Sequence, residues 1–188
     1  MAIEPAAPQI DRDKIERGIR LLLEGIGEDP EREGLVGTPN RVARMWEEFI
    51  ARRQYKCASF SAEEYDEMVL VTLPVYSLCE HHLVPFFGKI SVGYIPKDGK
   101  VLGLSKICRI VEHFALRPTI QERLTAQVAK RVQEETDAIG VGVIMEATHL
   151  CMSMRGVQKP GHVTTTSKMI GAFMEQPETR QELLELIK

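Results

Sequence analysis

The chain has little excess charge of either sign and few aromatic residues. Its 188 residues include 24 Lys and Arg against 27 Asp and Glu, and aromatic residues make up 6%. A balanced charge excludes a general electrostatic attraction to nucleic acid or to an anionic membrane surface. Any site for an anion must therefore be local.

Long apolar runs and a leader-like N-terminus are also missing. The chain begins Met1-Ala2-Ile3-Glu4-Pro5, and no apolar run approaches the roughly 18 residues that cross a membrane. We therefore expect no membrane association and a cytoplasmic location. The four cysteines would then lie in a reducing compartment, where thiols are buried, catalytic or metal-bound rather than joined in a disulfide framework.

Composition is typical of a soluble globular protein with one main domain, since 44% of the residues are hydrophobic and 27% are charged. Residues 1–10 are rich in Pro and Ala and predict a flexible arm. Residues 11–66 predict an N-terminal helical segment, with apolar residues at helical spacing from Ile15 to Ile26 and again from Val42 to Phe49 after Thr38-Pro39. Residues 67–188 predict the main domain.

Within residues 67–188 the pattern changes to short β-rich runs and amphipathic stretches. It predicts strands at 69–73, 86–95, 141–154 and 163–173, and a closing helix from 177 to 187. Ser105 predicts the cap of one helix, and a capping box from Thr119 to Glu122 predicts the start of a longer one. This order predicts an α+β fold, with a mostly antiparallel sheet and its helices on one face. Gly140 and Gly142 lead us to expect that a second subunit covers part of that strand.

Side chains that can hold a metal or move a proton gather in two segments far apart in the sequence. The first is Cys79-Glu80-His81-His82, and the second holds His149 and Cys151. On one extended strand His149 and Cys151 would share a face. Cysteine sulfur and histidine nitrogen are the ligands that zinc prefers, and a catalytic zinc keeps one position open for water. The spacing is too wide for a compact zinc finger and fits a site built across a fold.

Two other interpretations of these residues stay open at this point. A lone cysteine or histidine is more often a buried core residue, although clustering makes that less favoured here. A closed structural site could also use Cys79, His82, His149 and Cys151 together. Spacing does not choose between three ligands and four.

Several Lys and Arg residues lie in the first turns of expected helices, where the helix dipole makes positive charge unfavourable. Lys106 and Arg109 lie in the first turns of the expected helix at Ser105, and Arg41 stands near the start of the helix at Thr38. The helix dipole disfavours such cations by about 0.3–1 kcal/mol each. A polyanion bound at these positions would compensate the cost. The alternative is a solvated surface with carboxylates such as Glu112 nearby.

Glu122 also allows two interpretations. As the last residue of a capping box it would only stabilise its helix. As a free carboxylate it could accept from two adjacent donors, such as N1–H and the exocyclic amine of guanine.

These motifs together resemble those of the GTP cyclohydrolase I family. The resemblance runs in the family's order across nearly the whole chain from residue 11. The matching strings are Thr38-Pro39-Asn40-Arg41, Cys79-Glu80-His81-His82, Gly103-Leu104-Ser105-Lys106-Ile107, Gln121-Glu122-Arg123-Leu124, His149-Leu150-Cys151-Met152 and Met154-Arg155-Gly156-Val157.

The resemblance implies a zinc enzyme that converts GTP and water to formate and 7,8-dihydroneopterin triphosphate, the first step towards folate or tetrahydrobiopterin. It implies the tunnelling fold and a ring-shaped homodecamer with sites at subunit boundaries. By position, Cys79, His82 and Cys151 resemble the zinc ligands, and His81 and His149 are left for proton transfer.

The resemblance assigns the substrate contacts in the same way. Glu122, with Gln121 beside it, resembles the guanine anchor, and Ser105 resembles a ribose contact with a role in proton transfer. Arg41, Lys106, Arg109 and Arg155 resemble the triphosphate contacts. The loop 158–162 matches no pattern that we can assign, and His162 is left without a role.

Two rival functions are weighed against this one. A zinc deaminase would carry H-x-E and P-C-x-x-C segments, and neither occurs in the sequence. A non-catalytic purine- or pterin-binding relative with a structural zinc would not need every metal ligand together with both additional histidines.

Overall fold

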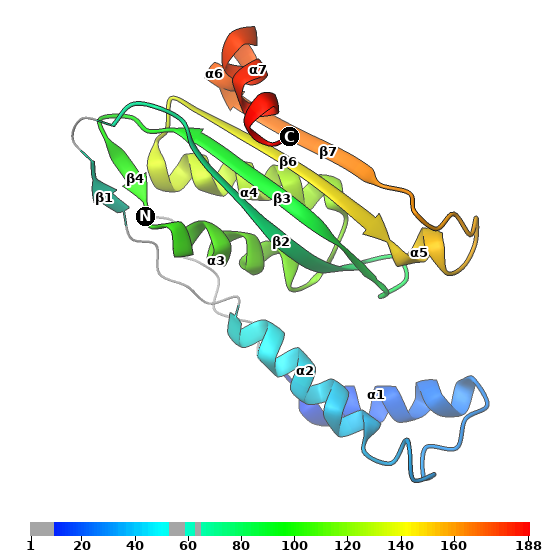
Figure 1. The fold of residues 1–188 in the computed structure, drawn as a ribbon. Coiled ribbons are helices and arrows are strands. Elements are labelled where there is room, and N and C mark those ends of the chain that lie inside the picture. Colours follow the sequence, from blue (N-terminus) through cyan, green and yellow to red (C-terminus); the bar gives the residue numbers. More distant parts are fainter. Residues whose placement is uncertain (1–9, 53–58, 63–64) are drawn as a thin grey trace. The chain divides into compact units, whose positions relative to one another are not determined.

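The computed structural model describes residues 10–52, 59–62 and 65–188, which form two compact units (Figure 1). The units divide the chain at residues 54 and 55. Most of the expected arm, residues 1–10, lies outside the described residues, and so does Cys57. In the described part of the chain, no helix is long and apolar enough to span a membrane.

The first unit is a pair of helices, both within the segment 11–66 that is expected to be helical. Helix α1 spans Arg12–Gly25 and α2 spans Thr38–Arg52. The side chain of Asp11 caps α1 by accepting a 2.9 Å hydrogen bond from the backbone N–H of Lys14. Asn40 on α2 donates to Glu16 on α1 at 3.1 Å, so a polar contact joins the helices as well as their apolar faces.

The second unit is built on a five-stranded sheet in the order β5-β2-β3-β6-β7 (Figure 1). Its strands are β2 Val69–Cys79, β3 Pro85–Ile95, β5 Pro118–Thr119, β6 Gly140–His149 and β7 Thr164–Gly171. All neighbours are antiparallel except β2 and β5. The short strands β1 Ser59–Ser61 and β4 Lys100–Leu102 pair separately. An α+β fold with an antiparallel-rich sheet is therefore confirmed.

Two long helices, α3 Leu104–Ala115 and α4 Gln121–Thr136, cover one face of the sheet. Alternate residues of β2 point to them, which places Val75 in the core, and Ile90 and Val92 of β3 lie on the same side. Ile107 of α3 and Leu124 of α4 are fully buried against these strands. The alternation of apolar residues thus orients β2 and β3, whose far ends carry the candidate site.

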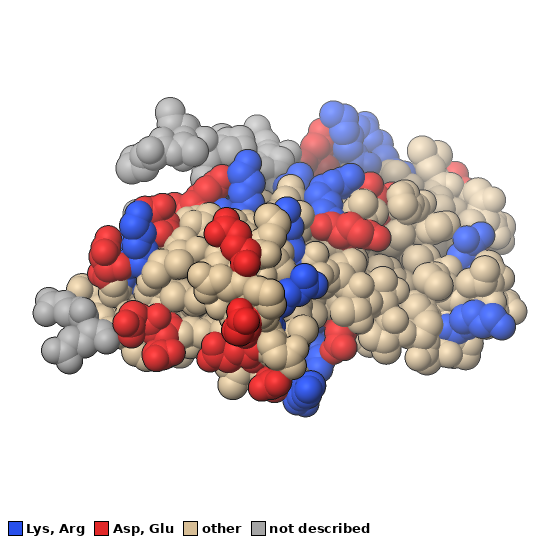
Figure 2. All heavy atoms as spheres, turned by 90° about the horizontal axis from the view of Figure 1, so that it is seen from above, with Lys and Arg blue, Asp and Glu red and all other residues tan. Residues whose placement is uncertain are grey.

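The opposite face of the sheet is covered at one end by the C-terminal helices α6 Ala172–Glu175 and α7 Pro177–Leu186. A Cβ added at Gly142 would lie only 2.5 Å from Cδ2 of Leu183, so glycine lets α7 pack directly on β6. At this position the chain's own helix α7 covers β6. Figure 2 views the molecule from above relative to Figure 1. On the face that it shows, Lys and Arg side chains are interspersed with Asp and Glu side chains.

Three local expectations about element ends are also wrong. Helix α3 begins at Leu104 with Gly103 as N-cap, so Ser105 is inside the helix and caps nothing. Helix α4 begins at Gln121 with Ile120 as N-cap, because Thr119 pairs with Cys79 as part of β5. Strand β6 ends at His149, where the short helix α5 Leu150–Ser153 begins. For Thr119, pairing in the sheet overrides the local capping signal.

Candidate active site and metal centre

The loop between β2 and β3 brings His82 back towards Cys79. Cys79 is the last residue of β2, and its carbonyl oxygen accepts from the backbone N–H groups of His82 at 3.3 Å and Leu83 at 2.7 Å. Leu83 closes this tight turn with φ of 57°, a conformation that bulky residues rarely adopt. As a result Nδ1 of His82 lies 3.8 Å from Sγ of Cys79.

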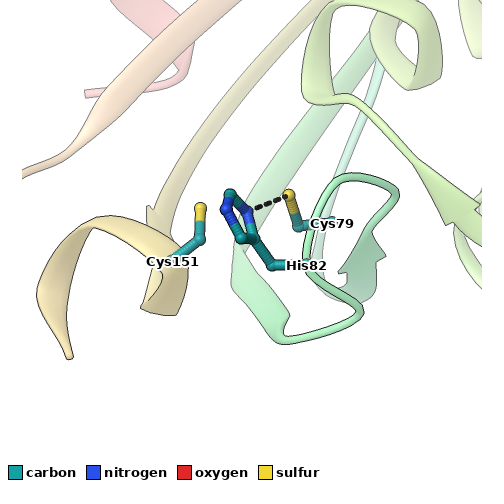
Figure 3. A group of neighbouring side chains, drawn as sticks. All are labelled: Cys79, His82 and Cys151. Atoms are coloured by element: carbon teal, nitrogen blue, oxygen red, sulfur yellow. Dashed lines mark hydrogen bonds between the residues drawn. The ribbon is translucent and has the colours of Figure 1, made fainter. Parts of the chain in front are cut away.

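The third member of the group comes from the start of α5. Because β6 ends at His149, Cys151 lies on a helical turn and the expected shared strand face of His149 and Cys151 does not exist. The turn nevertheless brings Cys151 to the other two residues (Figure 3). One ligand atom from each of Cys79, His82 and Cys151 lies within 4.8 Å of those of the others. Among the described residues these three form the group that could hold a metal ion, and His149 is not part of it.

The second nitrogen of His82 contacts an arginine. Nε2 of His82 lies 3.1 Å from Nη1 of Arg155. A guanidinium can only donate, so Nε2 accepts and the neutral ring carries its proton on Nδ1, towards the sulfur of Cys79. The structure thus brings Arg155, one of the cations expected at the triphosphate, directly to the cluster.

Burial raises the pKa of the Cys151 thiol above its ordinary value, and the neighbouring Cys79 sulfur raises it further. A thiol must lose its proton to become a metal ligand. The cluster without a metal therefore holds protons that a bound cation would displace.

A pocket of about 230 Å³ opens beside the cluster. It brings together side chains from β2, β3, the start of α4 and the end of β6. Its lining residues are Cys79, His81, Phe86, Thr119, Ile120, Gln121, Glu122, His149, Cys151, Met152 and Thr164. Six residues expected at the site from the sequence therefore line one pocket: Cys79, His81, Gln121, Glu122, His149 and Cys151. Two of them, Cys79 and Cys151, are candidate metal ligands.

His149 is tightly held at the wall of this pocket. Its ring stacks on the buried ring of Phe86, with centroids 4.7 Å apart and planes 6° apart, and its Nε2 lies 2.7 Å from Oε1 of Gln121. Burial lowers the pKa of His149 below its ordinary value; the nearby His162 lowers it further, and Glu122 acts in the opposite direction. Burial therefore favours the neutral form of this imidazole.

Glu122 is free to meet a ligand. Because Thr119 belongs to β5, the expected capping box does not form, and the N-cap of α4 has no side-chain hydrogen bond. The side chain of Glu122 is exposed and lines the pocket. The purely structural interpretation of this carboxylate is therefore wrong.

An ion pair joins the loop after β2 to the start of α4. Glu80, next to the first ligand, contacts both terminal nitrogens of Arg123, next to Glu122. This bond lowers the pKa of Glu80. A further backbone bond of 3.1 Å, from the N–H of Glu80 to the carbonyl of Thr119, supports the same link.

The remaining expected contacts lie elsewhere in the chain. The hydroxyl of Ser77 donates to the carbonyl of Ala115 at 2.7 Å, so the C-terminal end of α3 is the end beside the cluster. Ser105, Lys106 and Arg109 lie in the N-terminal half of α3, whose 12 residues span roughly 18 Å at about 1.5 Å per residue. One chain does not bring them to the pocket. Arg41 lies in α2, in the first compact unit.

Sequence reasoning gave no role to Phe86 or His162. Phe86 lies near the start of β3 and is buried between two exposed neighbours, as the alternation of a strand predicts. Its contact with His149 depends on the β3–β6 register, in which the two residues are partners. The backbone N–H of His149 donates to Nε2 of His162 at 3.3 Å. The pairing of loop 158–162 with β6 leaves no local signal in the sequence.

The chain is also similar in sequence to known proteins. The family described as GTP cyclohydrolase I matches residues 15–188. Proteins named GTP cyclohydrolase 1 are 57% identical in Aquifex aeolicus (strain VF5), over 95% of this chain and 98% of that protein, and 58% identical in Sulfurihydrogenibium sp. (strain YO3AOP1), over 95% and 96%. The relative in Clostridioides difficile (strain 630) is 48% identical over 95% of this chain and 97% of its own length.

A solved structure, the archaeosine synthase QueF-Like in the apo form, covers 55% of this chain and 93% of its own, with 19% identity and a TM-score of 0.47. A likeness of that size carries no argument. The family match that reaches from residue 15 to the last residue, and relatives this similar over nearly their full length, show that the chain belongs to the GTP cyclohydrolase I family.

Proposed function

We propose that this chain converts GTP and water to formate and 7,8-dihydroneopterin triphosphate, the first step towards folate or tetrahydrobiopterin. The observation that carries the proposal is the convergence of Cys79, His82 and Cys151 beside a pocket lined by Glu122 and His149. Three ligands leave a place for water, which a closed four-ligand site would not. The sheet with its two helices further supports a tunnelling fold.

We infer that zinc is the cofactor. Two sulfurs and one imidazole are the donor set that zinc accepts, and their mutual distances suit a single ion. When bound, zinc acts as a Lewis acid and lowers the pKa of a water ligand towards about 7. The thiols of Cys79 and Cys151 must be deprotonated for this role, as must the nitrogen of His82 that binds.

The residues around the cluster provide orientation and proton transfer. Glu122 would accept from N1–H and the amine of guanine, which places C8 of the base at the cluster end of the pocket. His149, neutral and fixed at the pocket wall, would protonate N7 after taking up a proton, making C8 more electrophilic. His81, exposed at the pocket mouth, would move protons during ribose opening and ring closure together with Ser105.

The triphosphate would be held by cations from more than one chain. Arg155 is already beside the cluster, whereas Lys106, Arg109 and Ser105 are not near it in the same chain. A second copy can supply them if the sites lie at subunit boundaries, as in the homodecamer that the resemblance implies. Arg41 would contribute in the same way from α2.

Incubating the purified protein with GTP tests the proposal. Formate should be released together with a product that becomes fluorescent on oxidation, and a chelator should abolish both until zinc is restored. Release of ammonia would instead indicate a deaminase. Tight GTP binding without any product would indicate a non-catalytic purine- or pterin-binding relative.

A further inference from the structure

The side chain of Gln121 is buried and fully engaged. It is 1% exposed, although it lines the pocket wall. Its Nε2 donates to the carbonyls of Thr164 at 2.9 Å and Met145 at 3.0 Å and lies 3.1 Å from the hydroxyl of Thr166. Its Oε1 lies 2.7 Å from Nε2 of His149. Little of this amide remains for a substrate.

The two backbone carbonyls fix which way the amide points. Both can only accept, so the amide nitrogen of Gln121 must face them. The reversed amide would place its oxygen against two carbonyl oxygens in a buried position, which costs the unmade hydrogen bonds. The amide oxygen therefore faces His149, and the hydrogen between them belongs to Nε2 of the imidazole.

Two further contacts hold His149 in place. Phe86 stacks on one face of the ring. The backbone N–H of His149 donates to Nε2 of His162, whose Nδ1 lies 2.8 Å from the carbonyl of Lys159 and can only donate to it. His149 is thus restrained at the face of its ring, at ring Nε2 and at its backbone N–H.

We propose that Gln121 is a positioning residue for His149, which keeps the proton of the neutral ring on Nε2 and so presents Nδ1 to the substrate. The inference rests on the proposed function and replaces the guanine contact that the resemblance assigns to Gln121. When Nδ1 takes up a proton the ring carries both N–H groups, and the bond from Nε2 to Gln121 persists. When Nδ1 gives that proton to the base, the starting tautomer returns.

Nitrogen-15 NMR of the histidine rings tests the tautomer without any turnover. The chain has five histidines, so a ¹⁵N-histidine-labelled protein gives five ring patterns, and the His149→Ala variant identifies one of them. The wild-type protein should show His149 protonated at Nε2 and bare at Nδ1. A wild-type ring protonated at Nδ1 would overturn the proposal, whether or not the protein acts on GTP.

Kinetics of Gln121→Met separate positioning from substrate contact. We expect kcat to fall about 10- to 100-fold, as for other residues that orient a functional group, with KM within about twofold and zinc content unchanged. Thr166→Val is the matched control, because it removes a hydroxyl from the same network but keeps both carbonyl acceptors, and it should retain kcat. A loss in Gln121→Met that resides mainly in KM would overturn the proposal. Should that variant not fold, Gln121→Asn is judged by the same criterion.

Discussion

In the proposed function, individual side chains at the site divide between metal binding and proton transfer. Cys151 belongs to the cluster, whereas His149 is bonded to Gln121 and outside it, although only Leu150 separates the two in sequence. Because the strand ends at His149 and a helix begins at Leu150, the side chains of His149 and Cys151 do not share a face. Neighbouring residues can therefore have independent roles.

We expect Cys151→Ala to lose both bound zinc and turnover, and His149→Ala to keep zinc and lose turnover. The reason is that only the first variant removes one of the three ligands. Metal analysis of the purified variants and formate assays measure the two effects. Equal loss of zinc in both variants would favour the closed four-ligand site.

Zinc affinity should rise with pH until the pH passes the raised pKa of Cys151, which lies above the ordinary thiol value of 9.0. The pKa of Cys151 is raised by burial and by Cys79, so protons compete with the metal for the sulfur at lower pH. Titration calorimetry of the metal-free protein in two buffers with different ionisation enthalpies measures the protons released. An affinity that does not change with pH would contradict this assignment.

At the scale of the elements, the start of α4 serves the site. Glu122→Ala should weaken GTP binding by about 1–3 kcal/mol, because the donors of the base would lose their acceptor. The melting temperature should stay nearly unchanged, since Glu122 caps nothing in the structure. Equilibrium binding and thermal unfolding of the same samples test both statements. A large loss of stability with normal binding would restore the capping interpretation.

The pair Glu80–Arg123 should make a small, acid-sensitive contribution to stability. Arg123 lowers the pKa of Glu80 from its ordinary 4.5, so the folded state binds a proton less readily than the unfolded chain. The contribution is present above pH 4.5 and is lost as the pH falls through the lowered value. Thermal unfolding should therefore separate the wild type from Glu80→Gln at pH 7 and not in strong acid. A difference that persists in strong acid would assign it to packing.

How far the sequence predicts these elements depends on how local their causes are. The helices at 12–25 and 177–186 and the strand at 85–95 follow from periodicity and were predicted closely. The starts of α3 and α4 differ from the expectation. Gly103, and not Ser105, is the N-cap of α3, and Thr119 pairs with Cys79 in the sheet instead of capping α4. The pocket wall depends on the β3–β6 register, which no local pattern contains.

At the scale of the whole molecule, one chain carries the cluster and, in the N-terminal half of α3, cations that do not line the pocket beside the cluster. We expect two inactive variants, Cys79→Ala and the double variant Lys106→Ala/Arg109→Ala, to restore activity when mixed into one oligomer. Random mixing would leave about a quarter of the boundary sites with both halves intact. Formate release by the co-expressed proteins, with their mass measured in solution, tests this. Mixed oligomers without activity would place both halves in one chain.

The positions of the two sulfurs also determine whether folding or metal binding comes first. Cys79 ends β2 and Cys151 follows β6, and β3 lies between these strands, so the cluster exists only after three strands have paired. In small zinc modules the ion drives folding, but here the scaffold must come first. The chain should therefore fold without metal, and adding zinc to the folded protein should be enough to make it active.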